Sequence, residues 1–569
     1  MVDINAKNPR LPIGIDDYKD LIDEDCIYID KTLLIKEFLG SANKVTLVTR
    51  PRRFGKSIAL SMLKYFFEKT EESTSYLFEK SKIWQEEGFK QLQGTFPVIH
   101  ISLKDIRGTT WAEACEEFKI LLAKEVSRAL APLASQMNDT QKKTYESLIN
   151  KKASEVEFTE SLIFISEINK KHLDKTTIIL IDEYDSPITH AYVHKFYDKM
   201  IEFMRQLLSK ALKSNTNLHR GFMTGVVRTA KDGIVSGLNN PKICTMLDAN
   251  FSDKFGFTQE EVDHLLQITN RKDKGAEVKK WYNGYVIGTK NSKLARSVYN
   301  PWSVLNYLGS FSEHPECYWS NTGSTNLLER LIAEADVKTQ EELRLLIEGK
   351  ALENKVIDED VLLLDLDNKG CEPWSFLFFT GYLTATSYTF ENKYAFQLKL
   401  PNKEISDLFK NLVMKAIDKK LSSAKLEDFL KALIKGDTPK VESSLREFVL
   451  SFCSSHDLPY YDLERSLHLF VLGLLVTLSE RYIVDSNIES GKGRYDIMLC
   501  PKPHSQDLSV ILEFKKGENL EKLASEALEQ IKTKHYKTRL EKLGYLGPIL
   551  AYGIATYKKE LLVKLEIIT

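Results

Sequence analysis

Two segments in the N-terminal half each join an apolar strand to a charged turn, and they restrict the fold more than any other feature. In the first, residues 44–49 (KVTLVT) read as a buried strand, residues 50–57 (RPRRFGKS) as a loop and residues 58–67 as a helix. A strand, a Gly-Lys-Ser loop and a helix in this order are the context that a phosphate-binding loop requires. We therefore expect an α/β domain with helices packed on a parallel sheet.

The residues of this loop have separate expected roles. The helix start offers free N–H groups and a positive dipole end to phosphate, and Gly55 belongs to this cradle. Lys56 would reach the β- and γ-phosphates, and the Ser57 hydroxyl would bind Mg²⁺. Arg50 stands where the common motif has its first Gly. We count it among the nucleotide-binding residues, although its side chain changes the loop.

The second segment, residues 177–185 (TIILIDEYD), is an apolar strand that ends in acids. Asp182 would hold Mg²⁺ through water, and Glu183 would polarise the attacking water. Residues 96–103 (FPVIHISL) form a further strand between the two segments, as in the additional-strand class of P-loop ATPases. In the strand that follows, Thr224 takes the sensor position, and Arg228 is a secondary candidate for contact with the γ-phosphate.

Near the C-terminus, an acid begins one apolar strand and a Glu-x-Lys ends the next. Asp496 lies in GRYDIML (493–499), and Glu513 and Lys515 lie in VILEFK (510–515). Alternation along a strand puts Glu513 and Lys515 on one face, and Asp496 can face them from the neighbouring strand. Two carboxylates and an ammonium can hold Mg²⁺ or Mn²⁺ and activate water beside a phosphate. An exposed ion-paired edge is the simpler alternative, but the apolar run before Glu513 favours a buried strand.

The elements around this pair of strands complete a small α/β arrangement. Helices are expected over 467–478 and 520–534, and another strand over 547–555. Residues 529–531 (EQI) of the second helix, with Tyr536 after them, resemble the helix motif of the PD-(D/E)XK nuclease superfamily, and this resemblance implies that Gln530 faces the site.

Three further polar residues are candidates for supporting roles in the same half. Glu489 precedes the strand of Asp496 and can approach it. Glu464 and His468 are four residues apart on one helical face, so either can serve as an upstream metal-site residue. Surface pairing with neighbouring cations explains Glu464 equally well.

These two constellations resemble known families. Asp496, Glu513 and Lys515 occupy the motif positions of the PD-(D/E)XK nuclease superfamily, with Tyr495 in place of the usual Pro. The N-terminal motifs resemble the bacterial AAA-ATPase-like family, whose loop also begins with Arg and whose members typically carry a C-terminal PD-(D/E)XK domain. The resemblance rests on residues 12–14 (PIG), 28–32 (YIDKT), 50–57, 180–185 (LIDEYD), 236–240 (SGLNN) and 281–285 (WYNGY).

The patterns along the chain and the resemblance together lead us to expect an α/β chain of four parts. They are a P-loop AAA-like ATPase domain of the additional-strand class (1–250), a helical, lid-like segment (251–325), a connector domain (326–440) and a restriction-endonuclease-like nuclease domain (441–569). The second part is rich in aromatic residues, and its position after the sensor strand suggests a lid over the nucleotide. Ordinary core packing is the alternative explanation for those aromatics.

The implied activity is an ATP-dependent or ATP-regulated, metal-dependent nuclease that hydrolyses DNA phosphodiester bonds, with ATP and Mg²⁺ (or Mn²⁺) as cofactors. The rival interpretation is a nucleotide-switched binding or signalling module whose nuclease fold serves recognition. Intact Asp496, Glu513 and Lys515 favour cleavage. A homo-oligomer, completed by an Arg from a neighbouring subunit, remains open.

Composition adds mainly exclusions. The formal net charge of the 569 residues is −1, so any nucleic-acid contact must be local. A basic cluster beginning at Lys515 and ending at Arg539 can follow a phosphate backbone, or it can be a solvated helix face. Seven Cys without a CxxC pair favour a reducing compartment. The opening residues show no secretion signal and no run is long enough to span a membrane, so we expect a cytoplasmic protein.

Overall fold

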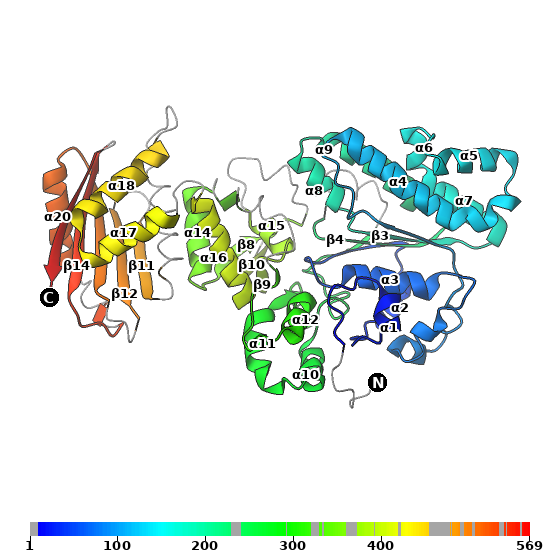
Figure 1. Ribbon diagram of the computed structural model, residues 1–569, viewed down its shortest axis with the longest axis horizontal. Coiled ribbons are helices and arrows are strands. Elements are labelled where there is room, and N and C mark those ends of the chain that lie inside the picture. The colour runs from blue at the N-terminus through cyan, green and yellow to red at the C-terminus, as the bar shows by residue number, and fades with distance from the viewer. Residues whose placement is uncertain are drawn as a thin grey trace. The chain divides into compact units, whose positions relative to one another are not determined.

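A computed structural model of the chain separates into two compact units (Figure 1). The N-terminal unit comprises Met1–Thr322 and Leu352–Ile405, and the C-terminal unit comprises Gly323–Ala351 and Ser406–Thr569. The residues that the structure describes are 10–228, 241–291, 293–319, 329, 331–332, 335–359, 373–391, 393–418, 423–453, 478, 481–489, 494–502, 507–533, 540–541, 543–557 and 560–569.

The N-terminal unit is built on a parallel sheet of five strands in the order β2-β3-β4-β1-β5. Its central strands are continuous apolar runs that are buried along their length, as expected when helices cover both faces of a parallel sheet. The strands are β1 Val45–Thr49, β2 Val98–Ser102, β3 Thr177–Asp182, β4 Leu218–Gly225 and β5 Lys242–Cys244.

Helices cover this sheet on both sides (Figure 1). One side carries α1 Tyr18–Asp23, α2 Leu33–Gly40 and α3 Lys56–Phe67; the other carries α4 Trp111–Leu130, α5 Asp139–Ile149, α6 Glu155–Thr159, α7 Ser161–Leu173, α8 Ser186–Val193 and α9 Tyr197–Leu212. Short 3₁₀ turns lie at Ser75–Leu77, Lys82–Gln85, Ala131–Gln136 and Lys272–Lys274. The expected P-loop architecture is confirmed.

The strand inserted between the two motif strands is not the one that the chain order indicates. In the sheet, β4 lies between β1 and β3, whereas β2 lies at the outer edge beyond β3. The additional strand is therefore β4, which carries Thr224, and not the strand of residues 96–103. Sequence order cannot reveal this, because parallel strands are joined by crossovers that can skip a position.

The remainder of the N-terminal unit contains short helices and two small antiparallel sheets, β6-β7 and β8-β10-β9. Its elements are α10 Gln259–Ile268, α11 Gly275–Tyr282, β6 Tyr285–Ile287, β7 Arg296–Val298, α12 Pro301–Gly309, β8 Leu352–Val356, α15 Trp374–Phe379, β9 Thr384–Glu391 and β10 Lys393–Lys399. Tyr282, Tyr299 and Tyr307 are fully buried in one apolar cluster with Val262 and Leu265. For these tyrosines, core packing is the observed role. Residues 326–440, expected as one connector, are divided between the two units.

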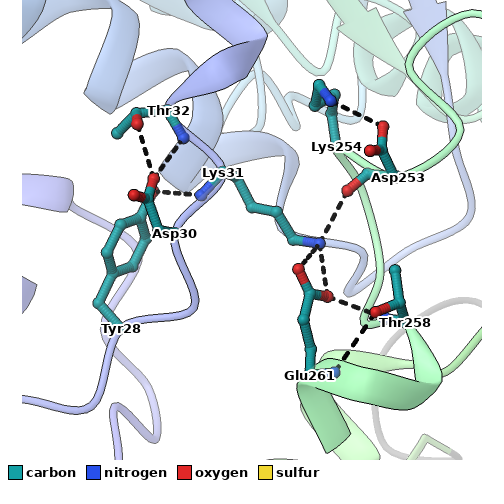
Figure 2. A network of polar contacts seen from close by, with 8 residues as sticks. All are labelled: Tyr28, Asp30, Lys31, Thr32, Asp253, Lys254, Thr258 and Glu261. Carbon is teal, nitrogen blue, oxygen red and sulfur yellow. Dashed lines mark hydrogen bonds and ion pairs between the residues drawn. The ribbon is translucent and has the colours of Figure 1, made fainter. Parts of the chain in front are cut away.

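A partly buried ion pair ties the opening segment of the chain to α10 (Figure 2). The Lys31 ammonium donates to both carboxylate oxygens of Glu261 at 2.7 Å and to the Asp253 carbonyl at 2.8 Å. Glu261 also completes the capping box of α10 with Thr258. Asp30 holds the other side of this turn by accepting from the amide and hydroxyl of Thr32. The YIDKT segment is thus an anchor that positions α10.

The C-terminal unit is centred on a five-stranded sheet in the order β11-β12-β13-β14-β15, in which only β13 and β14 run parallel. The strands are β11 Tyr482–Glu489, β12 Arg494–Pro501, β13 Ser509–Lys516, β14 Ile549–Tyr557 and β15 Glu560–Ile568. The helices are α14 Val337–Ile347, α16 Lys403–Asp418, α17 Ser423–Lys435, α18 Thr438–Cys453 and α20 Leu520–Thr533, with α16 beginning in the N-terminal unit. The expected helix over 520–534 and strand over 547–555 are confirmed. Most of the expected helix over 467–478 lies outside the described residues.

Two neighbouring residues of β14 show that α17 and α20 pack on opposite faces of this sheet. Tyr552 donates its hydroxyl to the Leu433 carbonyl of α17 at 2.8 Å. On the other face, a Cβ added to Gly553 would lie 2.2 Å from the Ala524 carbonyl oxygen of α20. Gly553 therefore allows α20 to approach the sheet closely, directly beside Glu513, with which it is paired in register.

No helix in the described ranges is long and apolar enough to cross a membrane.

Candidate functional site: a phosphate-binding loop and a carboxylate strand pair

The phosphate-binding loop joins β1 to α3 through two left-handed residues. Arg53 has φ +67° and Gly55 has φ +80°, and α3 begins immediately afterwards at Lys56. The Lys56 ammonium lies inside the loop, where it donates to the carbonyls of Arg50 at 3.0 Å and Pro51 at 2.9 Å. Burial lowers the pKa of Lys56, and the nearby carboxylates of Glu183 and Asp182 oppose that shift. A cation held at the start of a helix is well placed for an anion.

Arg50 supports the loop through its side chain and does not point toward a phosphate. Its guanidinium is fully buried, and burial lowers its pKa to about 10. It donates to five backbone carbonyls at 2.8–3.4 Å, those of Thr49, Cys244, Thr245, Asn250 and Phe251. The expectation that the Arg50 side chain belongs to the nucleotide cradle is therefore corrected. The planar guanidinium of Arg50, with its several N–H donors, suits this group of carbonyls. A Gly at this position has no side chain to bind them.

Asp182 brings three of the expected residues together at the end of β3. Its carboxylate accepts the Ser57 hydroxyl at 2.6 Å, and it also accepts the Thr224 hydroxyl. The Glu183 amide donates to the same carboxylate at 3.0 Å. Ser57 comes from α3 and Thr224 from β4, so three segments far apart in sequence converge on one buried acid. A carboxylate that holds a hydroxyl beside a phosphate loop is the oxygen environment that Mg²⁺ prefers.

The two acids that follow Asp182 have different surroundings. Glu183 adopts a left-handed backbone with φ +50°, and burial raises its pKa while the charge of Lys56 opposes the shift. Asp185 is buried and accepts the amides of Val226 and Val227, each at 2.8 Å. Burial also raises the pKa of Asp185, but its carboxylate is engaged by these two amides and fixes the backbone immediately before Arg228. A carboxylate with a raised pKa suits a proton acceptor, and this is the role expected for Glu183.

In the C-terminal unit, the sheet register brings the expected acids together. Asp496 of β12 pairs directly with Glu513 of β13, which places both residues on one face. Glu513 is fully buried. Lys515 lies two residues further along the same face, and its side chain is 17 % exposed. The Lys515 ammonium lies 3.8 Å from the Glu526 carboxylate of α20, a neighbour that sequence reasoning missed.

An apolar floor ends where these polar residues begin. On the face that α20 covers, Met498 and Ile511 pack with Leu528 and Ile531 of that helix. Along the strands, Asp496 follows the alternation of Met498, and Glu513 that of Ile511. On this face of the sheet, the apolar core and the candidate site are therefore only two residues apart along each strand.

An open hollow of about 510 Å³ adjoins Lys515 along α20. Gln530 lines it, as expected, and its Nε2 is buried without a hydrogen-bond partner among the described residues. The remaining lining residues are Lys522, Ser525, Glu526, Glu529 and Thr533. Two acids in this hollow reduce its affinity for a phosphate backbone, so the basic cluster is less uniform than the sequence indicated.

The supporting candidates are only partly brought to the site. Glu489 pairs with Arg494 at the far end of β11, whereas Asn487, which the sequence reasoning did not single out, is opposite Asp496. Lys532 forms ion pairs with Glu529 and Glu566 at 3.0 and 2.9 Å, as a solvated helix face would. His468, Glu464 and residues 534–539 lie outside the described part of the chain.

Comparisons with known proteins find a family match for each of the two domains. Residues 12–235 match a family model described as "Predicted AAA-ATPase", and residues 462–566 match one described as "PD-(D/E)XK nuclease superfamily". The chain joins an AAA-ATPase-like domain to a PD-(D/E)XK nuclease superfamily domain.

A similar chain covers both of the matched domains. It is an "Uncharacterized protein in vnfD 5'region" of Azotobacter chroococcum mcd 1, 25% identical over 564 residues that span 96% of each chain. The likeness therefore includes the segments between the two domains. No solved structure matches.

Proposed function

We propose that this AAA-ATPase-like protein is an ATP-dependent or ATP-regulated, metal-dependent nuclease that hydrolyses DNA phosphodiester bonds. The observation that carries the proposal is the direct pairing of Asp496 with Glu513, with Lys515 on the same face, within a PD-(D/E)XK domain. A domain kept only for recognition has no need of acids at directly paired positions of adjacent strands, because like charges opposite one another destabilise a sheet.

At the nucleotide site, the residues fit Mg²⁺ and ATP. Mg²⁺ would supply positive charge to the β- and γ-phosphates, held by Ser57 and, through water, by Asp182. Lys56 would leave the loop carbonyls and bind those phosphates. Glu183 would accept the proton of the attacking water, and Thr224 would orient that water from the neighbouring strand. The raised pKa of Glu183 supports its role as the base.

At the nuclease site, the donor set fits a divalent cation with oxygen ligands. In the described part of the chain, no group of three or more His, Cys, Asp or Glu side chains forms a complete metal cluster. A cation there would use Asp496 and Glu513 together with water or substrate oxygens, as Mg²⁺ commonly does. Such a cation would stabilise charge on the phosphate. Lys515 would orient the attacking water and stabilise the same charge, and Gln530 would contact the substrate from α20.

A plasmid-nicking assay with the full chain tests the proposal. Supercoiled DNA is incubated with Mg²⁺ or Mn²⁺, with and without ATP, and with EDTA as the metal-free control. We expect relaxed or linear product only with metal, at a rate that ATP changes. DNA binding without any cleavage in either metal would instead support a nucleotide-switched binding or signalling module.

A further inference from the structure

Four consecutive residues of the phosphate-binding loop each contact the later part of the N-terminal unit. The backbone of Gly381 packs closely against Pro51, since a Cβ added to Gly381 would lie 2.7 Å from the Pro51 side chain. The other three contacts involve aromatic rings: the Trp319 Nε1 donates to the Arg52 carbonyl at 3.3 Å, the Arg53 guanidinium lies 4.2 Å from the Trp302 ring centre, and Phe54 packs edge-on against Tyr285.

Glu404 fixes the backbone of Trp319 in place. A carboxylate oxygen of Glu404 accepts the amide of Trp319 at 2.9 Å and the amide of Tyr318 at 2.8 Å. The Ser303 hydroxyl donates to both carboxylate oxygens, at 2.8 and 3.0 Å. Glu404 is fully buried, and Trp319 is 4 % exposed. Removing a carboxylate from water is costly, so its position here is set by these three donors.

We propose that Glu404 is a positioning residue of the nucleotide site, which acts through Trp319 to hold the phosphate-binding loop in the conformation that accepts phosphate. This inference rests on the proposed nucleotide-binding function and adds a residue more than 200 positions from the loop that no motif contains. The path runs from the Glu404 carboxylate to the Trp319 amide, and from the Trp319 ring to the Arg52 carbonyl. Backbone N–H groups of the loop bind phosphate only when their carbonyls are turned away, which is what the Trp319 hydrogen bond secures.

Isothermal titration of the full chain with ATP and Mg²⁺ tests this path. Glu404→Gln keeps the size of the side chain and removes its charge, and Trp319→Phe keeps an aromatic ring and removes the donor. We expect each to weaken ATP affinity about five- to tenfold, near the loss of one charge-assisted or neutral hydrogen bond. Glu353→Gln, an exposed Glu of β8, is the matched control and should bind like the wild type.

Two further readouts separate positioning from general destabilisation. The double variant should bind ATP no more than about twofold more weakly than either single variant, because the two residues act in one path. The change in tryptophan fluorescence on adding ATP should be reduced both in Glu404→Gln and in Trp319→Phe, in which Trp302, beside Arg53, still reports on the loop. If Glu404→Gln fails to fold, Trp319→Phe alone decides the inference by its ATP affinity.

Lys56→Ala distinguishes the failure of this inference from the failure of the nucleotide site. If Lys56→Ala loses ATP binding while Glu404→Gln and Trp319→Phe bind like the wild type, the positioning role is overturned. Fully additive losses in the double variant overturn the path through Trp319. If the wild type binds no ATP, or Lys56→Ala binds it equally well, the proposed nucleotide site itself fails.

Discussion

At the scale of single residues, acids in similar sequence contexts acquire different roles from what surrounds them. Glu183 and Asp185 are two positions apart after the same strand, yet Asp185 is occupied by two backbone amides. Burial raises the pKa of both carboxyls, but only Glu183 has the Lys56 charge as the largest opposing effect. The base and the positioning acid can therefore be told apart by their partners.

Substitution at Glu183 is expected to separate binding from turnover. Glu183→Gln should bind ATP within about threefold of the wild type and hydrolyse it at least about 100-fold more slowly, because an amide cannot accept the proton. Lys56→Ala should weaken ATP binding by at least about tenfold, since it removes the charge on the terminal phosphates. A calorimetric titration and a phosphate-release assay measure the two quantities. Wild-type turnover in Glu183→Gln would exclude Glu183 as the base.

Substitution of any one of the three proposed nuclease residues is expected to impair cleavage. Asp496→Asn, Glu513→Gln and Lys515→Ala should each slow metal-dependent cleavage by more than about 100-fold while the thermal melting profile is retained. Glu518→Gln, on the turn just after β13, is the control and should cleave at the wild-type rate. A folded Glu513→Gln protein that cleaves normally would contradict the assignment.

Glu404 predicts a pH dependence of stability whose sign follows from its burial. Burial raises the pKa of Glu404 to about 7, despite the donors Trp319, Ser303 and Tyr318. Tyr282, Tyr285 and Tyr318 also face this carboxyl, and their own raised pKa values keep them neutral in this range. The folded state therefore holds the proton more tightly than the unfolded state does. The stabilisation that this bound proton gives to the folded state is complete below about pH 4 and is lost as the pH rises through about 7.

A comparison of the wild type with Glu404→Gln isolates the contribution of the Glu404 carboxyl to the pH dependence of stability. Between pH 4.5 and 8, the wild type should lose about 3 kcal/mol of unfolding free energy relative to Glu404→Gln. Urea unfolding at a series of pH values measures that difference. A difference that does not vary with pH would show that Glu404 titrates at its ordinary pKa.

At the scale of elements, the nuclease site depends on how closely α20 approaches the sheet. Gly553 of β14 lies in register with Glu513 of β13 and faces the backbone of α20, so the helix that carries Gln530 meets the sheet directly beside the acid. The same close approach sets the distance between Lys515 and Glu526. Packing of a single helix therefore decides the shape of the hollow beside the site.

Gly553→Ala is expected to displace α20, because its Cβ would lie 2.2 Å from the Ala524 carbonyl oxygen. We expect a loss of about 1–3 kcal/mol in the stability of the C-terminal unit and impaired cleavage, with ATP binding unchanged. Chemical unfolding and the nicking assay measure the first two effects, and titration with ATP the third. Gly40→Ala, where the added Cβ meets nothing within 4 Å, is the control. Unaltered stability and cleavage in Gly553→Ala would show that α20 can shift freely.

At the scale of the whole molecule, one helix continues from the first unit into the second. The first residues of α16, including Glu404, belong to the N-terminal unit, and the helix from Ser406 onward belongs to the C-terminal unit. The chain therefore links the residue that positions the phosphate-binding loop to the unit of the nuclease without an intervening loop. Coupling between two sites requires an element that both can bias, and α16, at one of the places where the chain passes from one unit to the other, is a candidate.

Coupling between the two units has a strict test because binding linkage is reciprocal. A non-hydrolysable ATP analogue should change the affinity of the full chain for DNA by some factor, and DNA should change the affinity for the analogue by the same factor. Fluorescence anisotropy with labelled DNA and calorimetry with the analogue measure the two factors. In Lys56→Ala, the analogue should leave DNA affinity unaltered. If the wild type shows no change in either affinity, the two domains are only tethered.

Local pattern alone was enough to locate the main elements and the motif residues of this protein. The strand before Gly55, the acids after β3 and the Glu-x-Lys of β13 are each signalled by a few neighbouring residues, because apolar runs and Gly-Lys-Ser loops have short-range causes. The pairing of Asp496 with Glu513 could be anticipated for the same reason, since strand alternation determines which residues share a face.

Only the tertiary structure decided which distant residues complete these sites. Arg50 was expected beside phosphate and is instead bound by carbonyls from residues 244–251, close to two hundred positions later in the chain. The position of β4 between β1 and β3, the support of Trp319 by Glu404 and the proximity of Glu526 to Lys515 likewise arise from packing between separate segments. None of these contacts has a local signature, because a buried polar group is satisfied by whichever segment the fold brings to it.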